Sequence, residues 1–87
     1  MNRISAMRSL LRELDPVSLD IIDESHKHAG HAGARDGGGH YVLNIVSGQF
    51  AGKNMVARHR MIYSALKPMM KQEIHALTIL AHTPDES

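Results

Sequence analysis

A glycine-rich segment divides the chain and limits its fold more than any other feature. Residues 26–39, HKHAGHAGARDGGG, contain five of the seven glycines and three of the seven histidines. Such a segment has few side chains to bury and much backbone freedom, so it predicts a flexible loop. It is far longer than the roughly two to five residues of an ordinary β-hairpin connection, and long loops in compact domains are commonly functional or disordered.

The segments on either side of this loop alternate as strands do. Residues 17–25 place Val17, Leu19 and Ile21 on one face of a half-buried strand, and residues 40–47 (HYVLNIVS) predict a second strand. Residues 74–83 predict a third. There His75 shares its parity with three apolar residues, Leu77, Ile79 and Ala81, so its Cβ is expected to point toward the packed side of the sheet, near the rim.

An N-terminal helix is predicted from an apolar stripe, which consists of Ile4, Met7, Leu11 and Leu14. Pro16 ends this helix, because a residue before proline is pushed out of the helical region, here Asp15. Residues 48–53 (GQFAGK) predict a turn or a single helical turn, with Phe50 as a plug on the core.

A second helix is predicted to begin after Asn54, a plausible N-cap. Its apolar stripe, expected to face the sheet, consists of Met55, His59, Ile62, Leu66 and Met69. Pro68 falls inside this pattern, and proline in a helix removes an amide donor and clashes with a preceding carbonyl. We therefore expect a kink or a restart at Pro68.

Together these elements predict an α+β sandwich of order α-β-β-α-α-β, with helices packed on one face of a three-stranded mixed sheet. The first two strands form an antiparallel pair, and the helical crossover permits a parallel second pair. This arrangement resembles the KH fold of class II. The length of 87 residues allows one domain, 1–87, which ends in a short acidic tail at 84–87.

Composition and charge exclude several classes of function. The formal net charge is +1, so nucleic-acid or membrane binding would need a local patch. There is no cysteine, which rules out a disulfide, a thiol nucleophile, a thiolate zinc cage and unaided ligation of an iron–sulfur cluster. No apolar run approaches the roughly 20 residues of a membrane span, and the N-terminus lacks a signal-peptide core, so we expect a cytoplasmic protein. No catalytic constellation is recognisable, and we expect no enzyme.

Three blocks of sequence resemble one family. They are DESHKHAGH after the first strand, VSGQFAGKNMVARHRMIYSAL through the second helix, and IHALTILAHTP in the third strand. In this order and spacing they resemble the BolA family, over nearly the whole chain. The resemblance implies a KH-like fold and a heterodimer with a monothiol glutaredoxin, in which the two proteins share a [2Fe-2S] cluster. The free chain is then expected to be a monomer or weak dimer without a cofactor.

The resemblance also implies which histidines hold the cluster. The histidine of the I-H-A-L motif is His75, and the loop histidine that matches the family pattern is His28; His31 and His40 are in reserve. Imidazoles replace two thiolates on one iron in Rieske centres, so histidines suit a chain without cysteine. The partner's cysteine and its bound glutathione would supply the sulfur ligands.

Other interpretations remain open. His59 is expected to be a buried, hydrogen-bonded packing residue, and His82 to be solvated. A zinc site of loop histidines with Asp36 is less favoured, because a glycine-rich loop gives no rigid ligand shell. The alternative function is DNA binding and transcriptional control through a basic helix face; its candidate residues are Arg58, Arg60, Lys67 and Lys71. RNA binding is weakly supported, since no G-x-x-G loop is present.

Overall fold

The computed structural model describes residues 2–25 and 39–86. Its elements in chain order are α1 (Arg3–Leu11), the 3₁₀ turn η1 (Arg12–Leu14), β1 (Ser18–Asp23), β2 (Gly39–Val46), the 3₁₀ turn η4 (Gly48–Phe50), α2 (Met55–Ala65), α3 (Lys67–Met70) and β3 (Ile74–His82). The expected α-β-β-α-α-β order is confirmed, and the strand boundaries differ from the expected ones by one or two residues.

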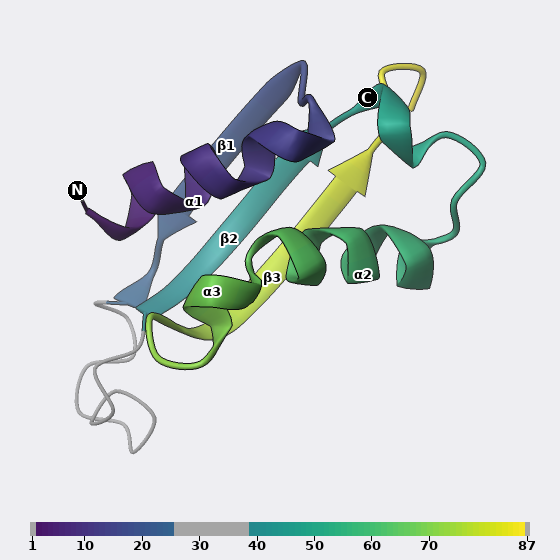
Figure 1. The fold of residues 1–87 in the computed structure, drawn as a ribbon. Coiled ribbons are helices and arrows are strands. Elements are labelled where there is room, and N and C mark those ends of the chain that lie inside the picture. The colour runs from purple at the N-terminus through teal and green to yellow at the C-terminus, as the bar shows by residue number, and fades with distance from the viewer. Residues whose placement is uncertain (1, 26–38, 87) are drawn as a thin grey trace.

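The three strands form one mixed sheet with β2 in the centre (Figure 1). β1 pairs with β2 in antiparallel register, from Ser18 opposite Val46 to Asp23 opposite Tyr41. β2 pairs with β3 in parallel register, and α2 and α3 make the crossover between them. The predicted mixed sheet is therefore confirmed.

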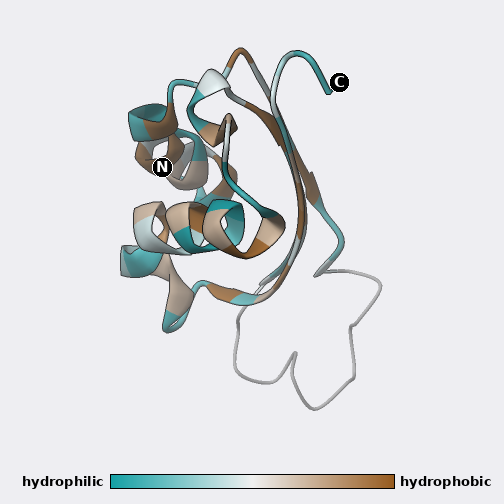
Figure 2. Ribbon diagram, turned by 90° about the vertical axis from the view of Figure 1, so that its right-hand side faces the viewer, coloured by the Kyte–Doolittle hydropathy of each residue, from teal (hydrophilic) through white to brown (hydrophobic). Residues whose placement is uncertain are grey.

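Within residues 2–25 and 39–86, all the helices cover one face of this sheet, and none of them covers the other face (Figure 2). β2 shows the division, because Tyr41, Leu43 and Ile45 are buried while Val42 and Asn44 between them are not. The core lies between the sheet and the helices. Its fully buried larger members are Phe50, Met7, Leu11, Leu43, Ile45, Ile62 and Leu66. Phe50 is thus the core plug that the sequence predicts.

Local signals explain where α1 begins and ends. Asn2 caps it, since Ser5 N donates to Asn2 Oδ1 at 2.8 Å. Met7 and Leu11 of the predicted stripe are buried, and Ile4 is partly buried. The chain then tightens into η1, and Asp15 before the proline leaves the right-handed helical region at a φ of 49°.

α2 and α3 follow the predicted pattern with one exception. Asn54 is the N-cap, with Ala57 N donating to its Oδ1 at 2.9 Å. Pro68 lies in the first turn of α3, where a missing amide donor costs little, so the expected restart is confirmed. Met55 was expected on the inner stripe, yet it is exposed; it stands in the first turn of α2, and the buried positions begin at Arg58.

Candidate functional site

Two histidines lie side by side where β2 and β3 begin. The ring centroids of His40 and His75 are 5.1 Å apart, with the planes tilted by 45°. His75 is exposed and His40 is partly buried. His40 follows Gly39 and precedes Tyr41, both of which are buried, so alternation along the strand directs its side chain to the face without helices.

An irregularity in the strand register brings His75 to His40. Gly39 is paired with Ile74, but His40 is paired with Ala76, which leaves His75 as an extra residue on β3. Such an insertion re-aims a side chain. The expectation that His75 points toward the packed side is therefore wrong: Ile74 takes the buried position, with 2% exposed, and His75 lies in solvent.

The ends of the glycine-rich segment are fastened beside this histidine pair. Ser25 Oγ accepts a hydrogen bond from His40 N at 3.0 Å, and His40 O accepts one from Glu24 N at 2.8 Å. On the returning side, Gly39 N donates to Glu73 O at 2.9 Å, immediately before β3. The candidate ligands His28 and His31 lie outside the described residues, but both attachment points of their segment are at the histidine pair.

The two remaining described histidines lie elsewhere. His59 is on α2, and its Nε2 is buried without a hydrogen-bond partner in the described part of the chain, so the hydrogen-bonded role expected for it is not found there for this atom. His82 is at the opposite end of β3 from His75 and is partly buried rather than fully solvated. Among residues 2–25 and 39–86, no group of three or more His, Cys, Asp or Glu side chains is placed to hold a metal ion. The described part of the site is therefore a pair of imidazoles and no more.

The expected basic face is only partly correct. Arg60, Lys67 and Lys71 are exposed, as the helix pattern predicts. Arg58 is not on this face, because only 7% of it is exposed and all three nitrogens of its guanidinium donate hydrogen bonds. It donates to the carbonyls of Lys53 (2.8 Å) and Ala81 (3.1 Å) and to both carboxylate oxygens of Glu86 (2.6 and 2.9 Å). Arg58 is therefore withdrawn from the candidate phosphate-binding residues.

Glu86 is the residue that sequence reasoning missed. Its hydrogen bonds from Arg58, and a further one from Thr83 N at 3.1 Å, lower its pKa from the usual 4.5 to about 2. The same contact raises the pKa of Arg58. The partners are 28 residues apart, and the sequence carries no periodic signal that would pair them.

The fold and the site together define a class: a small α+β domain with a mixed sheet covered on one face and a histidine pair at the start of its parallel strands. None of the helices in the described ranges is of the length and apolarity that a membrane span requires. The chain belongs to the family of BolA-like proteins, whose family model matches residues 10–86.

Relatives and solved structures agree with this membership. SufE-like protein 1 of Arabidopsis thaliana, chloroplastic/mitochondrial by its name, is 50% identical over 82 residues, which cover 88% of this chain and 22% of that protein. The DNA-binding transcriptional regulator BolA of Escherichia coli is 38% identical over 71 residues, 82% of this chain and 65% of that protein. The chain thus spans about a fifth of the plant relative. The structure of BolA1 from Arabidopsis thaliana superposes with a TM-score of 0.85 at 41% identity, covering 100% of this chain and 98% of that one.

Proposed function

We propose that this chain is a non-catalytic adaptor that binds a monothiol glutaredoxin and supplies histidine ligands to a shared [2Fe-2S] cluster. In this role it serves iron–sulfur trafficking or iron and redox regulation. The single observation that carries the proposal is the His40–His75 pair, at the place where the histidine-bearing segment leaves and rejoins the sheet.

His75 supplies the first ligand. It is the exposed member of the pair, so a partner protein can approach its ring without unfolding the strand. His40 lies against it at 5.1 Å between centroids, a spacing at which two imidazoles can serve one ion or one can orient the other. His40 is thus a supporting residue, with a reserve role as ligand.

His28 supplies the second ligand, with His31 in reserve. His28 is three residues beyond Ser25, and three residues of extended chain span about 10 Å at most. Ser25 is itself bonded to the backbone of His40. The proposal needs His28 to approach the histidine pair, and this short covalent connection to Ser25 supports it.

The donor set fits a cluster shared between two proteins. Iron–sulfur clusters are held chiefly by thiolates, and this chain has no cysteine. Two imidazoles can replace two thiolates on one iron, and the cluster then provides redox and exchange chemistry. The glutaredoxin cysteine and its glutathione would provide the sulfur, so the proposal requires a heterodimer.

The test is to titrate a glutathione-bound, cluster-loaded monothiol glutaredoxin with this chain and to follow visible absorption and circular dichroism. We expect a spectral change that saturates at one chain per cluster. His75→Ala should weaken or abolish it, and its far-UV spectrum should stay unchanged because the side chain is exposed.

His82→Ala is the matched control, since it removes the same side chain from the other end of the same strand. It should leave the spectral change intact. An unchanged visible spectrum with the wild-type chain, or equal effects of the His75 and His82 variants, would contradict the proposal.

A second candidate is DNA binding, which the name of the Escherichia coli relative and the exposed basic residues on α2 and beyond it favour. Its residues are now Arg60, Lys67 and Lys71. Affinity for duplex DNA should fall with salt, and Arg60→Ala with Lys67→Ala should reduce both the affinity and the salt dependence. Equal affinities of the double variant and the wild type would exclude this face.

A further inference from the structure

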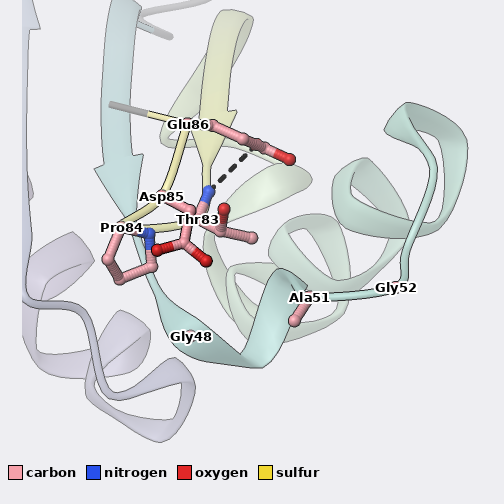
Figure 3. Close-up of a pocket in the computed structure, with 7 residues that line it drawn as sticks. All are labelled: Gly48, Ala51, Gly52, Thr83, Pro84, Asp85 and Glu86. Carbon is pink, nitrogen blue, oxygen red and sulfur yellow. Dashed lines mark hydrogen bonds between the residues drawn. The ribbon is translucent and has the colours of Figure 1, made fainter.

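A carboxylate is held by a buried arginine at the end of the sheet opposite the histidine pair. Both oxygens of Glu86 lie on the Arg58 guanidinium, at 2.6 and 2.9 Å, in the two-pronged geometry that arginine offers to carboxylates. A third donor, the amide of Thr83, reaches Glu86 Oε1 at 3.1 Å (Figure 3). Three N–H groups thus converge on one carboxylate.

Arg58 and the Glu86 carboxylate that it binds differ in their exposure to solvent. The Arg58 side chain is 8% exposed and the Glu86 side chain is 44% exposed. The guanidinium is fixed from behind by the carbonyls of Lys53 and Ala81, and it lies 5.9 Å from the ring centroid of the buried Phe50. The donors are therefore built into the core, whereas the carboxylate reaches them from the solvent side.

A cleft of about 490 Å³ opens beside this contact. Thr83, Pro84, Asp85 and Glu86 form one wall, and the other is formed by Gly48 of η4 and by Ala51 and Gly52, which follow it (Figure 3). A Cβ placed on Gly48 or on Gly52 would meet nothing within 4 Å. A small ligand therefore has open space from which to approach Arg58 when Glu86 moves away.

We propose that Arg58 and the Thr83 amide form a carboxylate-binding site, which the chain fills with its own Glu86 and which accepts a carboxylate from solution when Glu86 is absent. The ligand class is a carboxylate because the fork of Arg58 and the third N–H donor match its planar oxygens. Residues 84–86 then act as a displaceable strap over the cleft. This site is independent of the histidine pair.

The test is chemical rescue of Glu86→Ala by acetate at neutral pH and constant ionic strength, followed by thermal unfolding. Removing the carboxylate leaves a buried guanidinium without its counter-charge, so we expect Tm to fall by about 5 °C. Increasing acetate should raise Tm again in a saturating manner, recovering about half of the loss, since ligand binding to the native state stabilises it.

Three variants show whether rescue occurs at this site. Glu86→Gln keeps an oxygen acceptor in place and should not respond to acetate. Asp20→Asn removes an exposed acid on β1, which does not line the cleft, and should behave as the wild type. In the double variant Glu86→Ala with Arg58→Met, acetate should not raise Tm, because the guanidinium that binds the carboxylate has been removed.

The proposal is overturned if acetate raises the Tm of Glu86→Ala no more than that of the wild type or of Asp20→Asn. If Glu86→Ala is unfolded in the absence of acetate, far-UV circular dichroism replaces the Tm as the measurement. Acetate must then restore the spectrum of the folded protein, and a failure to do so equally overturns the proposal.

Discussion

At the scale of single residues, one extra residue in β3 decides which way the candidate ligand points. His75 has the parity of the core residues Ile79 and Ala81, and only the shift in register separates it from them. Parity is visible in a sequence, but a bulge is not, because it depends on how two strands pair. The identity of His75 as a candidate was therefore predictable, and its exposure was not.

The Arg58–Glu86 pair makes a prediction about pH. The folded pKa of Glu86, about 2, lies below its usual 4.5 because of the hydrogen bonds from Arg58 and Thr83, with His82 and Arg58 also contributing favourable charge. This contribution to stability is fully present above about pH 4.5 and is lost as the pH falls toward 2. Urea unfolding of the wild type should accordingly show a steeper loss of stability over that range than Glu86→Gln.

Asp85→Asn is the control for this series, since it removes an adjacent charge that makes no ion pair within the described residues. It should retain the steep pH dependence of the wild type. Parallel pH profiles for the wild type and Glu86→Gln would show that the pair does not link folding to pH.

At the scale of elements, β2 contributes both to the core and to the candidate site. Its odd-numbered residues fill the core, and its first residues hold the ends of the glycine-rich segment. Gly39 is tightly confined there, because a Cβ would lie 2.5 Å from the ring of the buried Tyr41. The start of β2 thus has no room for a larger residue.

Gly39→Ala should therefore destabilise the protein by about 1–3 kcal/mol, the usual cost of overpacking a core. Gly48→Ala is the matched control, because a Cβ there meets nothing within 4 Å, and its stability should be close to that of the wild type. Denaturant unfolding measures the free energy of unfolding of each variant. Equal stabilities would mean that Tyr41 yields without cost.

Most of the element pattern was predictable because it rests on local chemistry. The Asn54 cap, the restart at Pro68 and the buried Phe50 each follow from a few neighbouring residues. The exposure of Met55 and the burial of Arg58 were not predictable, since they depend on where the sheet and the residues after it lie against α2.

At the scale of the whole molecule, the two sites occupy opposite ends of one sheet. β3 runs from Ile74 to His82, and at about 3.3 Å per residue it separates His75 from His82 by roughly 23 Å. The histidine pair stands where β3 begins, and the Arg58–Glu86 contact stands beyond its end. A partner at the histidine end would therefore leave the cleft at the other end accessible.

The proposed function requires this chain to give nitrogen ligands to a cluster brought by a glutaredoxin. The most direct measurement is electron-nuclear double resonance of the reduced cluster, with ¹⁵N-histidine in this chain alone and an unlabelled partner. We expect strong ¹⁵N couplings from two imidazoles, and the loss of one of them in His75→Ala. A complex whose cluster shows no ¹⁵N coupling from this chain would rule out the proposed ligation.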